Sequence, residues 1–137
     1  MSGGGLRLPN GVREAMLAHC GQHYPKEACG FLIIDAGGTV ARIQPMRNVE
    51  DSPIGYSMDP KEQLQVEKQL RQRGERVAGI YHSHTATAAY PSPVDVSLAI
   101  SPDLSYVLVS LKDRSTPDVK SYRIEGTTVT EEEVSLV

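Results

Sequence analysis

The sequence predicts an α/β fold in which a mixed β-sheet is flanked by helices. Short apolar runs of strand length alternate with segments of helical periodicity in the order αββαβαββ, with one further extended piece near the end. Two helix starts carry strong start signals, at residues 59–62 and 92–95. With 137 residues, the chain is long enough for one ordinary domain with a single core.

The first expected element is an amphipathic helix from Asn10 to about His23. Its apolar and semi-polar positions follow the i, i+3, i+4, i+7 spacing of one helix face. Asn10 is a suitable N-cap, and Pro25 ends the helix. Residues 1–8 are rich in glycine and are expected to form a flexible tail, so residues 9–137 are expected to form the domain.

Apolar runs bounded by turn residues are expected to form the strands. The first two runs flank the turn at residues 35–38 and predict a hairpin, which a loop at residues 45–55 follows. The expected strands are residues 29–34, 39–44, 77–81, 104–111 and 119–124, with a last short extended piece at 129–134.

Two more helices are expected between these strands. Asp59 as N-cap and Pro60 at the first helical position start one that runs to about Arg73. Ser92 starts a shorter helix that runs through Ala99. The side chains expected to face the core are Leu64 and Leu70 in the longer helix, and Val94, Leu98 and Ile100 in or just after the shorter one.

Composition excludes several classes of function. A net charge of −3 and a pI near 5.8 give no support for nucleic-acid binding. No apolar run approaches the roughly 18–20 residues that a membrane span needs. The N-terminus lacks the charged and apolar regions of a signal peptide, so Cys20 and Cys29 are expected to be reduced thiols and the protein to be cytoplasmic.

The main candidate site follows the strand at residues 77–81. Successive side chains alternate faces on a strand, so His82 and His84 point the same way and can reach one metal ion. Asp95 can supply a third ligand if the loop between folds back. Three protein ligands with a fourth position left to water are typical of a catalytic zinc site.

This spacing, His-x-His followed by seven residues and Ser-x-x-Asp, resembles the JAMM/MPN+ family of zinc metallopeptidases. The resemblance spans nearly the whole chain and implies the curved mixed sheet of the JAMM/MPN (cytidine-deaminase-like) architecture. It also implies that His82, His84 and Asp95 bind zinc, and that Glu27 is the general base for the attacking water. The Ser92 hydroxyl would then help to stabilise the oxyanion.

Each of these residues also has a structural interpretation, and for Glu27 it is an ordinary surface glutamate that follows a lysine. Ser92 and Asp95 form a capping-box pattern at a helix start, and the capping and catalytic interpretations are both kept. A His-x-His pair alone would be structural more often than not. Cys29 shares the strand face of Glu27, but we interpret it as a small buried residue because the family uses no thiol nucleophile.

His19 and His23 lie four residues apart on the first helix, which is also a metal-ligand spacing. No third ligand is nearby in the sequence. We therefore interpret these two histidines as partly buried or surface residues.

Within the family, the chain is most similar to the bacterial Mec type. Its length and the segment at residues 87–92 carry this similarity, which implies a small ubiquitin-like sulfur-carrier protein as substrate. Such enzymes trim residues beyond a Gly-Gly end, and the small side chains of residues 86–89 leave space for that backbone. An isopeptidase for another ubiquitin-like modifier, and a small-molecule amide hydrolase or deaminase, remain alternatives. An inactive scaffold is disfavoured because no ligand or base is missing.

Overall fold

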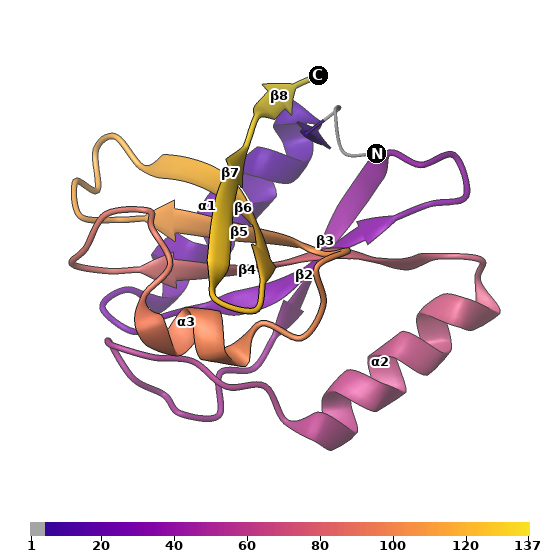
Figure 1. The fold of residues 1–137 in the computed structure, drawn as a ribbon, viewed down its shortest axis with the longest axis horizontal. Coiled ribbons are helices and arrows are strands. Elements are labelled where there is room, and N and C mark those ends of the chain that lie inside the picture. The colour runs from indigo at the N-terminus through magenta and orange to yellow at the C-terminus, as the bar shows by residue number, and fades with distance from the viewer. Residues whose placement is uncertain (1–4) are drawn as a thin grey trace.

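The computed structural model describes residues 5–137 as a mixed six-stranded sheet with helices on both faces (Figure 1). The strand order is β3-β2-β4-β5-β6-β7; β4 and β5 run parallel, and the other neighbours run antiparallel. The elements are β1 (Leu6–Leu8), α1 (Asn10–His23), β2 (Cys29–Ile34), β3 (Val40–Met46), α2 (Pro60–Gln72), β4 (Arg76–His84), α3 (Pro93–Leu98), β5 (Ser105–Ser110), β6 (Asp118–Glu125), β7 (Thr128–Glu132) and β8 (Val134–Leu136). The predicted α/β class is confirmed.

The sheet separates two apolar clusters because its strand residues alternate between faces. On one face, α1 packs through Met16 and Cys20 against Tyr81 of β4. On the other face, α2 and α3 cover a second cluster that includes Ile80 and Leu108 (Figure 1). No helix within residues 5–137 is both long enough and apolar enough to cross a membrane.

The central strand β4 brings the candidate ligands to the face that α2 and α3 cover. His82 and His84 have the same parity as Ile80, so they extend that face beyond the second cluster. Strand β2 pairs antiparallel with β4, with Cys29 opposite His82, so Glu27 is placed just beyond the paired region. The sheet register therefore brings the start of β2 to the end of β4.

The expected tail at residues 1–8 is wrong for residues 6–8. These residues form β1, which pairs in parallel with β8, and the side chains of Leu6 and Leu8 are buried against α1. A three-residue strand is too short to show a periodic pattern in the sequence, and its partner lies at the other end of the chain. Residues 1–4 lie outside the described residues.

Helix ends and faces also differ in part from the sequence prediction. Pro9 occupies the N-cap position of α1, so Asn10 is the first helical residue and caps nothing with its side chain. Asp59 caps α2 as predicted, and Leu70 is buried, but Leu64 is exposed.

The shorter helix, α3, shows the largest difference. Val94, Leu98 and Ile100 are exposed, and the helix instead contacts the second cluster through Val96 and Ala99. Six residues make fewer than two turns, so the contact face depends on the adjoining loops rather than on helical periodicity.

Candidate metal centre and active site

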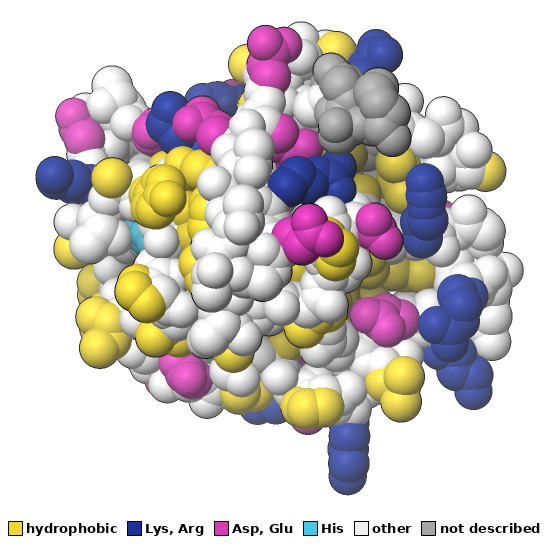
Figure 2. All heavy atoms as spheres, in the orientation of Figure 1, with side chains coloured by type: hydrophobic (Ala, Val, Ile, Leu, Met, Phe, Trp, Pro, Cys, Tyr) yellow, Lys and Arg dark blue, Asp and Glu magenta, His cyan; other side chains and the backbone are white. Residues whose placement is uncertain are grey.

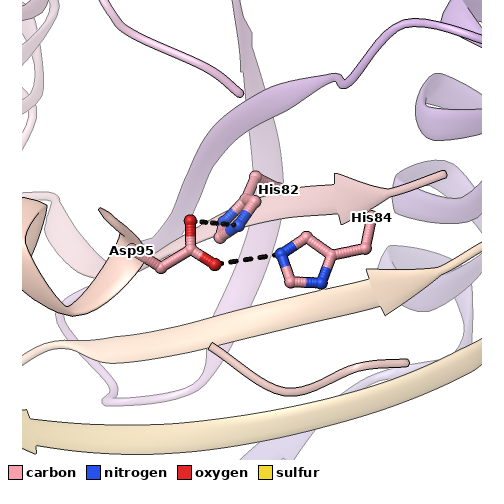
Figure 3. Close-up of side chains that lie close together, drawn as sticks. All are labelled: His82, His84 and Asp95. Atoms are coloured by element: carbon pink, nitrogen blue, oxygen red, sulfur yellow. Dashed lines mark hydrogen bonds and ion pairs between the residues drawn. The ribbon is translucent and has the colours of Figure 1, made fainter. Parts of the chain in front are cut away.

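Three side chains from β4 and α3 converge at the end of the central strand. The ligand atoms of His82, His84 and Asp95 all lie within 4.8 Å of one another. The Asp95 carboxylate lies between the two imidazoles, with Oδ1 3.2 Å from His82 Nε2 and Oδ2 2.9 Å from His84 Nε2 (Figure 3). The sequence-predicted ligand set is thus brought together.

The His82 ring provides a test of whether this cluster suits a metal. Its Nε2 atom is buried and has no hydrogen-bond partner among the described residues. The 3.2 Å contact with Asp95 does not have hydrogen-bonding geometry, although the atoms are close enough to count as an ion pair. A buried polar atom without a partner is unfavourable. An unpaired imidazole nitrogen beside a carboxylate fits a divalent cation such as Zn²⁺.

The two histidine rings are held in different ways. His84 Nδ1 lies 2.9 Å from the carbonyl oxygen of Ala88, which only accepts, so Nδ1 carries a proton and Nε2 is left to face the cluster. The His82 ring instead stacks on Tyr56, with ring centroids 4.3 Å apart and planes inclined by 26°. Both contacts orient an Nε2 atom toward Asp95.

The start of α3 positions Asp95 through a complete capping box. The Ser92 side-chain oxygen accepts a hydrogen bond from the Asp95 backbone N–H at 3.1 Å, and Asp95 Oδ2 accepts one from the Ser92 N–H at 2.9 Å. The predicted cap is therefore confirmed, and the same carboxylate also belongs to the cluster. Because Ser92 uses an oxygen lone pair for the cap, its hydroxyl proton is still free to be donated.

The electrostatics of the cluster favour a negative carboxylate between two imidazoles. Burial opposes ionisation of Asp95, but the close contacts with the His82 and His84 rings outweigh it and hold its pKa well below the usual range. Burial lowers the pKa of His82, whereas for His84 the contacts with Asp95 and Ala88 outweigh burial and raise the pKa. Without a metal, the His84–Asp95 contact needs a proton on Nε2, and a cation can replace that proton.

Glu27, the predicted base, precedes β2 and is only 6% exposed. Burial raises the pKa of Glu27 to about 7; His84 opposes this shift, and the negative charge of Asp95 adds to it. No described residue donates a hydrogen bond to its carboxylate. Glu27 is therefore a buried carboxyl group within the electrostatic influence of the cluster and tuned toward neutral pH, as a general base should be.

The family model for prokaryotic homologs of the JAB domain matches residues 9–125. The chain belongs to this family. It is 48% identical to the CysO-cysteine peptidase of Mycobacterium tuberculosis over 125 residues, which cover 90% of this chain and 86% of the relative.

Two solved structures show the same fold as this JAB-domain protein. The solution structure of protein DSY2949 from Desulfitobacterium hafniense superposes with a TM-score of 0.85 at 42% identity, covering 96% of this chain and 92% of that one. A structure described as a JAMM metalloprotease-like zinc site in the proteasome and signalosome superposes with a TM-score of 0.62 at 17% identity, covering 96% and 97%. The predicted family, JAMM/MPN fold and peptidase class are confirmed.

Other chemically active side chains of the JAB-domain protein lie outside the cluster. Cys29 is buried, and its thiol lies 3.8 Å from the carbonyl oxygen of Met46. His19 Nδ1 lies 2.6 Å from the hydroxyl oxygen of Tyr81 in the first cluster, whereas His23 is exposed. The structural interpretations of Cys29 and of both histidines are therefore supported.

Sequence reasoning missed the residues that hold the ligands. Tyr56, whose ring stacks on His82, lies just after the loop predicted at residues 45–55, and Ala88 was expected only as a small side chain, although its carbonyl group orients His84. Backbone acceptors and ring stacking leave no spacing signal in a sequence. Only the aromatic side chain at residue 56, close to a helix start, gave a hint.

Proposed function

We propose that this JAB-domain protein is a zinc metallopeptidase that hydrolyses the peptide bond after the C-terminal Gly-Gly of a small ubiquitin-like sulfur-carrier protein. The substrate proposal rests on the 48% identity to a CysO-cysteine peptidase across 90% of the chain. The zinc proposal rests on the unpartnered, buried His82 Nε2 atom beside Asp95. Release of the terminal residue or residues would expose the Gly-Gly end for cysteine or thiocarboxylate metabolism.

The ligand set assigns the metal to the end of β4. His82 and His84 would bind zinc through Nε2, and Asp95 through its carboxylate. Zinc bound there would supply a water of lowered pKa and a Lewis acid for the scissile carbonyl. Ala88 and Tyr56 keep the two imidazoles oriented.

Glu27 is proposed to move the proton. Its carboxylate takes a proton from the attacking water and passes it to the nitrogen of the leaving amine. The pKa near 7 suits both steps, because the group must accept a proton and then release it. The absence of a hydrogen-bond donor among the described residues leaves the carboxylate free for this transfer.

Ser92 is proposed to stabilise the oxyanion with its hydroxyl proton. Its oxygen already accepts a hydrogen bond from Asp95 N–H, so the hydroxyl group is fixed in place and retains one proton to donate. The capping and catalytic interpretations of Ser92 are compatible in this geometry.

A groove beside the cluster offers a path for an extended tail. It has a volume of about 160 Å³, and Tyr56, whose ring stacks on His82, is part of its wall. Hydrophobic side chains reach the surface over α3 (Figure 2), and Leu98 and Ile100 line the groove. An extended peptide in this groove would contact Tyr56, the ring that stacks on the proposed ligand His82.

In the loop after β4, the exposed segment at residues 86–88 carries little side-chain bulk. Residues 86–88 are exposed, and two of them are alanines, whereas Ala89 is buried in the second cluster. The space that residues 86–89 were expected to leave for a substrate backbone is therefore provided by residues 86–88 alone. A Gly-Gly backbone would approach the metal past these side chains.

The substrate proposal is tested with a purified carrier that ends in Gly-Gly-Xaa. Mass spectrometry after incubation with the zinc-loaded enzyme should report loss of the terminal residue. Replacement of the last glycine by valine should remove most of the rate, because a branched side chain would clash before the carbonyl group reached the metal. Glu27→Gln provides the inactive control.

Two results would contradict this substrate. One is cleavage of the valine carrier at the same rate as the Gly-Gly carrier, which would mean that the approach to the metal is not narrow enough to exclude a branched side chain. The other is efficient cleavage of ubiquitin dimers with none of the carrier, which would favour an isopeptidase.

We further propose a cytoplasmic location. Cys20 and Cys29 are both buried free thiols on opposite faces of the sheet, as suits a reducing compartment. Location of the tagged protein by cell fractionation tests this.

A further inference from the structure

The position of Glu27 is fixed by its backbone rather than by its side chain. No residue in the range 5–137 donates a hydrogen bond to the carboxylate, yet both backbone groups are bound outside the regular strand ladder. The Glu27 N–H donates to the carbonyl oxygen of Ser52 at 2.8 Å, and the Glu27 carbonyl accepts from Asn48 Nδ2 at 3.0 Å. Both partners belong to the loop between β3 and α2.

Asn48 is the centre of that loop. Its Nδ2 atom donates to the carbonyl oxygens of Glu27 and Gly55, each at 3.0 Å. Its Oδ1 atom accepts from the N–H groups of Glu50 and Ser57, also each at 3.0 Å. Both amide protons and both lone pairs are therefore used, which is the full capacity of an asparagine side chain. This amide closes residues 48–57 into one fixed loop.

Ala28, the residue after Glu27, is held by Ser83 of β4 rather than by the Asn48 loop. Ala28 N–H donates to the Ser83 side-chain oxygen at 2.9 Å, and the Ser83 N–H donates to the Ala28 carbonyl oxygen at 3.0 Å. The Ser83 hydroxyl thus replaces the backbone acceptor that a continued ladder would use. The chain can leave the sheet at this point, and Glu27 turns out of the strand with Asn48 as its direct side-chain support.

The same loop also contacts the metal cluster. Its segment at residues 55–57 is bound to the Asn48 amide at Gly55 and Ser57, and Tyr56 between them stacks on His82. Thr85 Oγ1, just after β4, donates to the carbonyl oxygen of Pro53 at 3.0 Å. One amide therefore connects the backbone of the proposed base with the aromatic ring that orients a proposed ligand.

We propose that Asn48 is a positioning residue that sets the place of the Glu27 carboxylate relative to the metal. It acts through the Glu27 carbonyl directly and through Ser52 indirectly. The inference rests on the proposed role of Glu27 as general base. A small displacement of a base lowers the rate strongly, because proton transfer requires hydrogen-bond reach.

The experiment compares Asn48→Asp and Asn48→Ala with a matched control, Asn10→Ala. Asn10 is the other asparagine of the chain, lies exposed at the start of α1 and makes no side-chain cap. Asn48→Asp keeps acceptors for Glu50 and Ser57 but loses both donors, so it removes the hold on Glu27 while retaining part of the loop. This variant also keeps the test valid if Asn48→Ala does not fold.

Each variant is assayed for zinc content, for kcat and KM, and for the titration of the Glu27 carboxyl group by ¹³C NMR in the metal-free protein. We expect Asn48→Asp to retain zinc and to lose roughly 10- to 100-fold in kcat with a smaller change in KM. The Glu27 titration midpoint should move measurably from that of the wild-type protein. Asn10→Ala should match the wild type in every measurement.

A second comparison separates this inference from the proposed function. In a Glu27→Gln background, Asn48→Asp should cause almost no further loss, because residues that act through one group are not additive. The inference is overturned by an equal fold-loss in both backgrounds, by wild-type kcat in Asn48→Asp, or by an unmoved Glu27 titration. Full activity of Glu27→Gln itself would instead overturn the proposed function.

Discussion

Single nitrogen atoms determine whether the cluster at the end of β4 can bind a metal. His84 Nδ1 is bound to a carbonyl oxygen, so the proton must be there, and His82 Nε2 has no hydrogen-bond partner among the described residues. Asp95 uses one carboxylate for two imidazoles and for a backbone N–H. The spacing predicted which residues meet, but not which atoms face one another, because the orienting groups are backbone carbonyls and a stacked ring.

Replacement of His84 by alanine tests the ligand assignment. The variant should lose zinc, because two protein ligands hold the ion far more weakly than three, and it should retain most of its fold. Metal analysis after dialysis gives the zinc content, and circular dichroism reports the fold. His23→Ala, which removes an exposed histidine, is the matched control. Full zinc occupancy in His84→Ala would contradict the assignment.

The raised pKa of Glu27 predicts an unusual dependence of stability on pH in the metal-free protein. Burial raises its pKa to about 7 from 4.5, so the folded state binds a proton more tightly than the unfolded state does. The stability associated with this group is fully present below about pH 4.5 and is lost as the pH rises through about 7. The loss approaches roughly 3 kcal/mol at high pH.

The Glu27→Gln variant should escape this loss. With a chelator present, urea unfolding should show it to be more stable than the wild type at pH 8.5, and about equally stable at pH 4.5. The exposed change Glu125→Gln should have no such effect. A constant difference between Glu27→Gln and wild type across this pH range would show that the charge of Glu27 is not responsible.

Short elements position the site, and they were the hardest to predict. The Ser92-to-Asp95 pattern correctly gave the start of α3, because a capping box is a local signal. The inward face of α3 was wrong, since a six-residue helix takes its orientation from the loops around it. The loop at residues 45–55 was predicted, but its organisation by Asn48 was not, because the amide joins groups that only the folded chain brings together, such as the Glu27 carbonyl.

Replacement of Ser92 by alanine and by glycine separates its two proposed roles. Alanine removes both the cap and the hydroxyl donor and should destabilise the protein by about 1 kcal/mol, whereas glycine is tolerated at N-caps with a loss of only a few tenths. Both variants should lose roughly 100-fold in kcat, because neither can donate to the oxyanion. Thermal unfolding and steady-state kinetics give the two quantities. Near wild-type turnover in Ser92→Gly would mean that the serine only caps the helix.

At the scale of the whole molecule, the two ends of the described chain close the fold on the α1 side of the sheet. Strand β1 pairs with β8, and Val137 N–H donates to the Leu8 carbonyl oxygen at 3.1 Å (Figure 1). The order of the longer elements was predictable from apolar periodicity, and the meeting of His82, His84 and Asp95 was predictable from their spacing. The β1–β8 pair was not, because it depends on contact between residues more than 120 positions apart in the sequence.

Weakened packing at the β1–β8 pair should lower the stability of the fold without changing its zinc affinity. Leu8 is fully buried in the first cluster, which lies across the sheet from the ligand face. Its replacement by alanine should therefore lower the free energy of unfolding by about 2–5 kcal/mol through lost burial and a cavity. The zinc affinity of the folded protein, measured by competition with a chelator dye, should stay within about twofold, because distant sites are nearly independent. Leu136→Ala, at a half-exposed position of β8, is the control and should change stability far less. A large fall in zinc affinity for Leu8→Ala would mean that the two faces of the sheet are coupled.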